Sequence, residues 1–532
     1  GPLLRGLPDR PGLLTFETRP LPPLAPSLCA NCPSPMRTLS LLVLLLLGAG
    51  AALPASSQDA PAPPERPNIV LAFADDWGMH ASTFGTAGLE TPTFDHLAET
   101  GVLFERAFVT TPSCTPSRGA LLTGQHTWRL GPAANLHSTL PADLPVYPDL
   151  LADEGGYVVG HEGKGWGPGN LAPGGRTAPP AGPEFEDFAA FLDERPDDRP
   201  FAYWFGTSDP HRDYDPALRD SMGVAPSAVR VPPTLPDVDS VRRDIANYYA
   251  EVERFDRAVG RLLEQLEAAG ELQNTIVVMT SDHGWPFPGG KSNLYDAGTR
   301  VPLAVYWPAA MAEGRTVRDF VSLTDLAPTF LEAAGVAPPA PMTGRSVLNI
   351  LTAADTGRVA AHRSHVLLAK ERHHGHARPG GTGYPSRAIR TADYLYVRNY
   401  EPDRWPAGAP FVSSSQGLFS DVDDGPTKQW MIDHADEPGV RPMFLRSFGR
   451  RPAEELYDLR SDSLQRRNVA DDPAYAAVKA HLARTLRQEL RALDDPRMAG
   501  RGDRFDAYPY YTGYGSERVT PPASVVEALG LE

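Results

Sequence analysis

Acidic residues gather directly after two apolar segments that have the composition of buried strands. The segments span residues 69–74 and 275–280, and the polar residues that follow them are Asp75, Asp76, Asp282 and His283. Carboxylates brought together in this way repel one another and need a cation to remain close. Oxygen-rich sites favour hard ions such as calcium or magnesium. The pattern therefore predicts a metal site, the alternative being helix caps or solvated loop residues.

A third apolar segment, at residues 201–205, ends shortly before His211. Segments that are apolar at every position are typical of strands buried on both faces of a parallel sheet. Apolar residues recur every three or four positions across residues 238–269, which predicts a helix, and residues 321–335 predict another. This alternation predicts an α/β fold. In open α/β sheets ligands bind at the carboxyl ends of the strands, where all three segments deliver polar residues.

Cys114 lies in the segment TPSCTPSRGALLTG, residues 111–124, which contains a C-x-P-x-R motif ending at Arg118. The other two cysteines, Cys29 and Cys32, form a C-x-x-C without the βαβ pattern that a redox site would have. A lone cysteine is often a small buried hydrophobic residue, so the motif is what singles out Cys114. The extended segment resembles the modification site of the type I sulfatases, in which a maturation enzyme converts the cysteine to formylglycine.

The resemblance to type I sulfatases implies one bound calcium ion and a covalent mechanism. The implied ligands are Asp75, Asp76, converted Cys114, Asp282 and His283. Many family members have Asn where this chain has His283, and calcium prefers oxygen to nitrogen. In the family, one hydroxyl of the hydrated aldehyde attacks sulfur and the other later expels sulfate. The metal and cationic side chains stabilise charge on the oxygens of the transferred group.

Cationic and acid–base side chains of the family also have matches here. Arg118 would lie one helical turn beyond Cys114 and reach back to the hydrate and the metal. The resemblance implies two sulfate-binding lysines and a leaving-group acid at Lys164, Lys291 and His211. The family often has a histidine two residues after the first lysine, where this chain has Trp166. His137 is the candidate replacement, although a lone histidine is more often structural.

Within the family, the chain resembles the heparan N-sulfatase (sulfamidase) branch. The resemblance rests on DPHR at 209–212, the segment at 281–299, the pair His373-His374 ahead of Gly383-Tyr384-Pro385, and ELYDL at 455–459. That branch has Glu directly after its histidine pair, whereas Gly375 follows here. The side chains expected to contact substrate are His137, Trp166, His373 and His374.

Two domains are expected. The resemblance implies an alkaline-phosphatase-like catalytic domain at residues 67–384, with a mainly parallel central sheet flanked by helices. Short strands and an amphipathic helix then predict a smaller C-terminal α+β domain with an antiparallel sheet at residues 385–495. The strands are expected at residues 388–391, 394–397 and 455–459, and the helix at residues 473–493. Residues 496–532 are predicted to be a tail.

Residues 36–55 have the pattern of a secretory signal peptide, with Met36-Arg37, a short apolar core and small residues up to Ala55. The apolar core is too short for a stable membrane span; an uncleaved anchor is the alternative. Residues 1–35 are predicted to be an upstream extension translated from a misplaced start codon, and residues 56–66 a proline-rich linker. We therefore expect a periplasmic or secreted protein.

The formal net charge of -16 argues against nucleic-acid binding and against capture of a polyanion by the whole surface. We expect an exported sulfatase that acts on sulfated carbohydrate, as sulfate ester or N-sulfate. The first alternative is a phosphomonoester or phosphonate hydrolase of the same superfamily. The second is a non-catalytic binder of sulfated glycan in which Cys114 is never converted.

Overall fold

The computed structural model describes residues 66–312 and 314–531, and the segments expected to be an extension, a signal peptide and most of a linker lie outside them. A seven-stranded sheet has the strand order β4-β5-β1-β6-β7-β2-β8. The strands are β4 (Val158–Glu162), β5 (Phe201–Gly206), β1 (Asn68–Ala74), β6 (Thr275–Ser281), β7 (Leu303–Tyr306), β2 (Val102–Phe104) and β8 (Arg315–Val317). Only β7 runs antiparallel to its neighbours in this sheet. The predicted mainly parallel sheet is confirmed.

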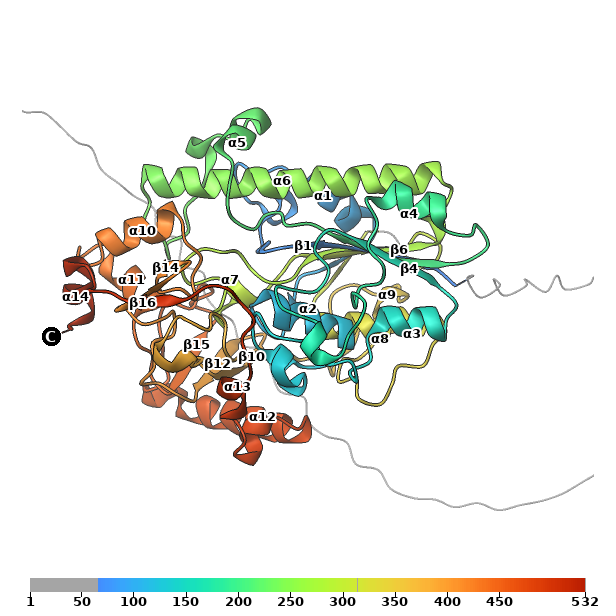
Figure 1. Cartoon of the computed structure of the whole chain (residues 1–532). Coiled ribbons are helices and arrows are strands. Elements are labelled where there is room, and N and C mark those ends of the chain that lie inside the picture. The colour runs from blue at the N-terminus through green and yellow to red at the C-terminus, as the bar shows by residue number, and fades with distance from the viewer. Residues whose placement is uncertain (1–65, 313, 532) are drawn as a thin grey trace, which may run out of the picture. The chain divides into compact units, whose positions relative to one another are not determined.

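Both faces of this sheet are covered by helices, which explains why its central strands carry continuous runs of apolar residues. Alternate residues of β1 enter two separate cores: Val70 and Ala72 face one, and Leu71 and Phe73 the other. The first core is covered by α6 (Asp239–Ala268), α1 (Pro92–Thr100), α4 (Phe188–Glu194) and α5 (Pro216–Met222). The second is covered by α2 (Cys114–Thr123), α3 (Tyr147–Asp153), α8 (Leu326–Ala333) and α9 (Leu348–Leu351). Figure 1 shows α6 and α1 on one side of the sheet and α2, α3 and α8 on the other.

The helix predicted at residues 321–335 is shorter than expected. The first two residues of this segment form the strand β9 (Val321–Ser322), which pairs with β3 (Ala107–Phe108). One 3₁₀ turn then precedes α8. The Ser322 side chain and the Asp325 carboxylate form a capping box at this point, which stops the strand and starts the helical turn. The predicted helix at 238–269 is confirmed as α6.

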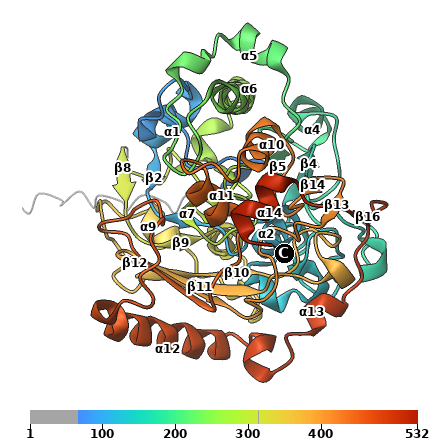
Figure 2. The ribbon, with the colours of Figure 1, turned by 90° about the vertical axis from the view of Figure 1, so that its left-hand side faces the viewer.

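A second, antiparallel sheet has the strand order β10-β11-β12-β15. Its strands are β10 (His365–Lys370), β11 (Ser386–Thr391), β12 (Tyr394–Asn399) and β15 (Glu454–Asp458). The helix α12 (Ala476–Ala492) covers one face through Leu482, Leu486 and Leu490, as Figure 2 shows below β11 and β12. Strand β10 precedes the boundary predicted at residue 385, because its short run HVLLAK was not assigned from the sequence. The domain limits themselves remain predictions.

Residues 496–531, predicted as a featureless tail, are built into the fold. They contain α13 (Arg504–Ala507), β16 (Ser516–Arg518) and α14 (Ala523–Leu529), and Phe505, Val525 and Ala528 are fully buried. β16 pairs with β13 (Val412–Ser414), which also pairs with β14 (Gly417–Leu418). The helices α10 (Pro426–Asp433) and α11 (Arg441–Phe448) contact α14, and α7 (Asp296–Thr299) follows β6. Among the described residues, no helix combines the length and apolar character needed to cross a bilayer.

Candidate active site

The aspartates predicted to bind metal meet at the carboxyl edge of the parallel sheet. Strands β1 and β6 are in register up to Ala74 and Ser281, so the residues after them lie side by side. The Asp76 amide donates a 3.0 Å hydrogen bond to Asp282 Oδ1, and the Asp75 amide donates to the carbonyl of Asp209, which follows β5. All three aspartate side chains at the two strand ends are buried. The carboxylates of Asp75, Asp76 and Asp282 therefore lie together at the edge of the sheet, as the sequence predicted.

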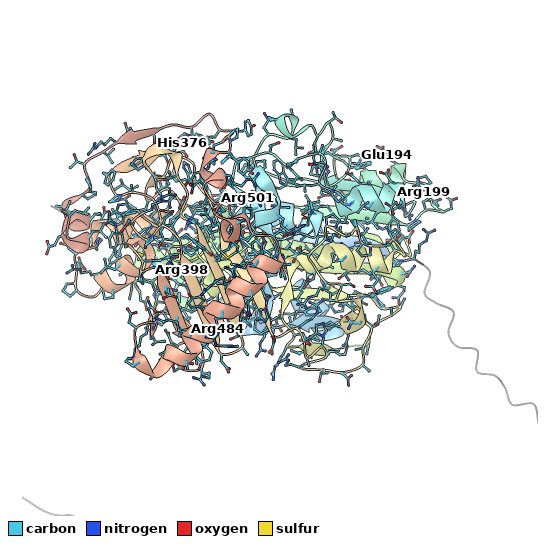
Figure 3. All side chains as sticks on the ribbon, turned by 90° about the horizontal axis from the view of Figure 1, so that it is seen from below. Glu194, Arg199, His376, Arg398, Arg484 and Arg501 are labelled. Carbon is cyan, nitrogen blue, oxygen red and sulfur yellow. The ribbon has the colours of Figure 1, made fainter. Side chains whose placement is uncertain are left out.

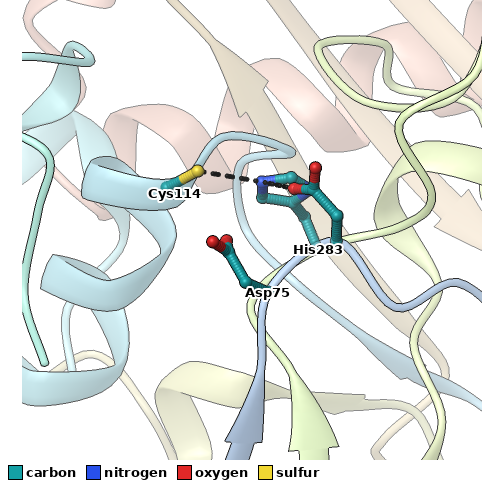
Figure 4. A group of neighbouring side chains, drawn as sticks. Asp75, Cys114 and His283 are labelled. Carbon is teal, nitrogen blue, oxygen red and sulfur yellow. Dashed lines mark hydrogen bonds and ion pairs between the residues drawn. The ribbon is translucent and has the colours of Figure 1, made fainter. Parts of the chain in front are cut away.

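Cys114 is the first residue of α2, and its Sγ lies 3.4 Å from His283 Nε2 (Figure 4). His283 Nδ1 lies 3.0 Å from the carbonyl oxygen of Gly284, which can only accept, so Nδ1 carries a hydrogen. The second nitrogen, Nε2, faces Asp76 Oδ1 at 3.1 Å. In the neutral tautomer, a nitrogen lone pair therefore points at a carboxylate and a sulfur atom. This close approach is satisfied by a proton shared among the three groups or by a cation.

Four side chains offer ligand atoms that all lie within 4.8 Å of one another: Asp75, Asp76, Cys114 and His283. Oδ1 of Asp75 and Oδ1 of Asp76 are buried without a hydrogen-bond donor in the described part of the chain. Such oxygens fit a cation, because a buried carboxylate oxygen without a partner is costly. Asp282 lies outside this group, and its oxygens accept from the Asp76 amide and from Arg118 Nε at 2.9 Å.

Three cations surround the cluster. Lys164 Nζ binds Asp75 Oδ2. Lys291 Nζ lies 2.9 Å from both Asp76 Oδ2 and Asp423 Oδ2. Arg118, one turn along α2 as predicted, also donates from Nη1 to the Lys164 carbonyl at 2.7 Å. It therefore ties α2 both to the β6 end and to the loop that carries Lys164.

These cations separate the two adjacent carboxyl groups electrostatically. Burial raises the pKa of Asp75, but Lys164, His211 and Arg118 more than offset it and hold that pKa well below its usual range. Burial also raises the pKa of Asp76, and there it outweighs the opposing effect of Lys291 and the histidines. Asp75 is therefore the more firmly ionised of the two.

His211 lies in a loop that the long helix α6 fixes through the neighbouring residue, Arg212. Its Nδ1 donates to the carbonyl of Arg212, and its Nε2 lies 3.9 Å from Asp76 Oδ2. The Arg212 guanidinium binds Asp244 of α6 at 2.7 and 2.8 Å, which fixes the loop after β5. The His211 side chain is 32% exposed, so Nε2 can serve as a proton donor to a group that enters the site.

A cavity of about 510 Å³ opens over this cluster. All the side chains expected to contact substrate line it, and so do several that the sequence did not single out. The expected ones are His137, Trp166, His373 and His374, and the others include Ser415, Gln416, Ser420, Asp423 and Tyr514. Ser113 Oγ lies 2.8 Å from His373 Nδ1, and burial lowers the pKa of that imidazole. His373 is therefore a neutral neighbour of the Cys114 motif.

Asp423 and Tyr514 were missed for different reasons. Asp423 lies in the run DVDDG at 421–425, whose carboxylates could have been noted, but no strand or helix pattern pointed to the sheet edge. Tyr514 belongs to the segment predicted as a tail. The sequence feature that could have revealed it is the run YPYYTGY at 508–514, which is too rich in tyrosine for a solvated tail.

The fold and the buried cluster together indicate a class of hydrolase. A mainly parallel sheet with buried carboxylates, a candidate metal group and two lysines at its carboxyl edge is the site of a hydrolase that handles an oxyanion. The family model described as Sulfatase matches residues 67–168 and 184–336. A second model, described as N-sulphoglucosamine sulphohydrolase, C-terminal, matches residues 281–406.

Individual proteins agree with these models. The chain is 29% identical to human N-sulphoglucosamine sulphohydrolase over 480 residues, which cover 80% of this chain and 89% of the human protein. It is 27% identical to an ulvan-active sulfatase of Formosa agariphila over 486 residues, 81% of this chain and 76% of that protein. The chain belongs to the type I sulfatase family, near its sulfamidase branch, and is a sulfuric ester hydrolase.

Solved structures confirm the predicted alkaline-phosphatase-like fold. A protein solved in complex with its substrate, D-glucosamine-2-N,6-O-disulfate, has a TM-score of 0.58 at 19% identity and covers 81% of this chain and 99% of its own. The phosphonate monoester hydrolase of Agrobacterium radiobacter has a TM-score of 0.58 at 20% identity and covers 80% and 95%. At this identity the likeness concerns the fold alone.

Proposed function

We propose that this sulfatase hydrolyses a sulfate ester or N-sulfate of a sulfated carbohydrate, with Cys114 converted to formylglycine and with one bound calcium ion. The observation that carries the proposal is the position of Cys114, at the start of α2 and among Asp75, Asp76 and His283. Relatives named for N-sulphoglucosamine and for ulvan support a sulfated sugar as substrate.

The state of the thiol supports conversion of Cys114. Burial raises the pKa of the Cys114 thiol far above neutrality, and Lys164 and Lys291 only partly offset this effect. An unmodified Cys114 is therefore a protonated thiol and a poor nucleophile at neutral pH. The hydrated aldehyde would instead supply one hydroxyl that attacks sulfur and a second by which sulfate is released.

Asp75, Asp76, converted Cys114 and His283 would hold the ion, with Asp282 orienting Arg118 behind them. Bound calcium would supply positive charge against the oxygens of the sulfuryl group. The imidazole of His283 is an unusual partner for calcium, and the two unpartnered carboxylate oxygens supply the harder ligands.

The remaining side chains would act on the substrate itself. Lys164 and Lys291 line the cavity and would bind sulfate oxygens, which places two positive charges where negative charge accumulates. His211 would give its Nε2 proton to the sugar oxygen or nitrogen as the bond to sulfur breaks. Asp423 would keep Lys291 in place from the side opposite Asp76.

A phosphonate or phosphomonoester hydrolase is the second candidate, because a phosphonate monoester hydrolase shares the fold. The two lysines and the match to the family models favour sulfate. A non-catalytic glycan binder would follow if Cys114 stayed a thiol. Export to the periplasm or beyond, and an encounter with a maturation enzyme, remain proposals that rest on the pattern at residues 36–55 and on the motif around Cys114.

Peptide mass spectrometry of the protein from its native host tests the proposal first. We expect the Cys114 peptide to have lost the elements of hydrogen sulfide and gained one oxygen. The same preparation should release sulfate from a panel of mono- and disulfated sugars, and a chelator should abolish this release until calcium is restored. Cys114→Ala is the matched inactive control. An unmodified thiol in a protein that still turns over phosphonate esters would establish the second candidate instead.

A further inference from the structure

The side chains that line the active-site cavity differ sharply in charge between its floor and its mouth. The floor is charged and buried: Asp75, Cys114, Lys291 and Asp423 are at most 7% exposed. The more accessible lining residues are uncharged types or histidines, namely His137, Trp166, Pro168, Ser208, Ser415, Gln416 and Tyr514. Lys164 and His211 lie between the two groups and belong to the catalytic cluster.

The histidines of the mouth do not add positive charge near neutral pH. Burial, with smaller effects of His374 and Lys164, lowers the pKa of His137 to about 4. Burial also lowers the pKa of His374, whose Nε2 lies 3.3 Å from Ser415 Oγ. Lys428, behind Gln416, donates to the carbonyl oxygens of Gln416 and Val422 and does not line the cavity.

Tyr514 is an exposed part of this mouth. Its side chain is 58% exposed, and of the three large apolar side chains that are exposed in the described residues, it is the one that lines the cavity. Hydrogen bonds and strand pairing fix the backbone on both sides of Tyr514. The Tyr511 amide donates to the His137 carbonyl, Tyr510 Oη donates to the His373 carbonyl at 3.2 Å, and Ser516 pairs with Ser414.

An aromatic ring beside hydroxyl and amide groups suits one kind of ligand. The face of a tyrosine packs on the apolar face of a sugar ring, and the Ser415 hydroxyl can donate to and accept from sugar hydroxyl groups. The Gln416 side-chain oxygen accepts from the Asp424 amide, which leaves its amide NH₂ group to donate to a sugar. Arg398 on β12 and Arg484 on α12, which could bind further sulfate groups, do not line this cavity (Figure 3). A second sulfate at the mouth would meet no unpaired lysine or arginine among the described lining residues, because Lys164 and Lys291 pair with Asp75, Asp76 and Asp423.

We propose that Tyr514, Gln416 and Ser415 form a subsite for an uncharged pyranose ring, so that this enzyme prefers a sugar unit with a single sulfate over the same unit with two. The inference rests on the proposed function and deepens it. The catalytic cluster binds the one sulfate that is cleaved, and the mouth selects the ring that carries it.

Steady-state kinetics on matched monosulfated and disulfated glucosamines test the subsite. We expect wild-type kcat/KM to be at least about 10-fold higher for the better monosulfated sugar than for D-glucosamine-2-N,6-O-disulfate. Tyr514→Ala should raise KM for the monosulfated sugar about 10-fold while kcat changes less than about threefold, and Tyr514→Phe should restore KM. Inhibition by inorganic sulfate should be the same in wild type and Tyr514→Ala, because sulfate occupies the floor.

A gain of function provides the second arm. Gln416→Arg should shift the preference toward the disulfated sugar by about 10-fold, since it places a cation at the mouth. Leu464→Ala, at an exposed position away from the cavity, should leave every parameter unchanged. A wild-type preference for the disulfated sugar, or an unchanged KM in Tyr514→Ala, would overturn the subsite while leaving sulfatase activity intact. A preparation with formylglycine that cleaves no sulfated sugar would overturn the proposed function and the subsite together.

Discussion

At the scale of single residues, Lys291 shows how this site holds its charges in place. Its ammonium group lies between Asp76 and Asp423 at 2.9 Å from each, and the side chain is almost fully buried. Burial lowers the pKa of Lys291, but Asp423 and Asp76 more than compensate and hold the pKa well above its usual value. A buried lysine with two carboxylate partners stays charged, and it stays where a sulfate oxygen would need it.

The first prediction concerns Asp423. We expect Asp423→Asn to lower kcat/KM by about 10- to 100-fold, which corresponds to about 1.4–2.7 kcal/mol of transition-state stabilisation. The reason is that Lys291 loses one of its two anchors and moves toward Asp76. Asp424→Asn, at the exposed neighbouring position, is the control and should retain wild-type activity. Sulfate release measured for both variants decides the point, and an Asp423→Asn enzyme within twofold of wild type would contradict it.

At the scale of elements, two glycines flank β4, and both have a positive φ, but only one of them lies against another backbone segment. Gly156 and Gly163 have φ of 70° and 62°, so an L side chain is strained at both. A Cβ at Gly156 would meet nothing within 4 Å, whereas a Cβ at Gly163 would lie 2.1 Å from the carbonyl oxygen of Gly206, where β5 ends. The close approach of these two backbones sets the position of the following residue, Lys164.

We therefore expect Gly156→Ala to cost about 1 kcal/mol of unfolding free energy, from backbone strain alone. Gly163→Ala should cost about 2–4 kcal/mol and lower kcat by more than about 10-fold, because the Lys164 loop must move away from β5. Urea unfolding and sulfate release on both variants separate strain from displacement. Equal losses in the two variants would show that the contact with Gly206 does not position Lys164.

Elements whose signals are local could be predicted from the sequence. The strands at Asn68–Ala74 and Thr275–Ser281 are buried on both faces, so their central residues are apolar, and the expected aspartates follow them. The segment that carries Asp421 and Asp423 has no such periodicity. It is fixed by buried ion pairs of Asp421 with Lys370 and Arg378, far away in sequence. Contacts of this kind leave no pattern along a single chain, which is why Asp423 was missed.

Helix α6 carries a carboxyl group whose protonation should affect stability. Burial, reinforced by Asp209, raises the pKa of Glu251 to about 7 despite the nearby Arg254. The folded state therefore binds this proton more tightly than the unfolded state, and stability falls as pH rises from about 4.5 through about 7. Glu251→Gln removes the cost of ionisation.

We expect Glu251→Gln to be more stable than wild type by about 1–3 kcal/mol at pH 8 and to show almost no gain at pH 4.5. Urea midpoints at the two pH values measure the difference. Glu264→Gln, an exposed position on the same helix, is the matched control and should gain nothing at either pH. A gain that is the same at both pH values would point to packing and not to ionisation of Glu251.

At the scale of the whole molecule, the C-terminal segment connects distant parts of the described chain. Phe505 is buried against the antiparallel sheet, and Tyr514 lines the active-site cavity. Tyr510 packs against His137 and His374, and α14 enters the same core as α6. Only a few of its side chains are fully buried, and its strand β16 is exposed along its length. Such segments open at lower free energy than the core they cover.

Val525→Asp should release this segment without unfolding the rest of the molecule. Val525 is fully buried, so an aspartate there would lose its hydration, at a cost of several kcal/mol. We expect limited proteolysis to cleave after Phe505 at least about 10-fold faster, with thermal unfolding of the remainder nearly unchanged. Ala523→Asp, which adds the same charge at the exposed start of α14, should resist cleavage as wild type does, because an acidic residue suits a helix N-terminus. If Val525→Asp instead lowers the melting temperature of the whole molecule without earlier cleavage, the segment unfolds together with the catalytic core and is part of its cooperative unit.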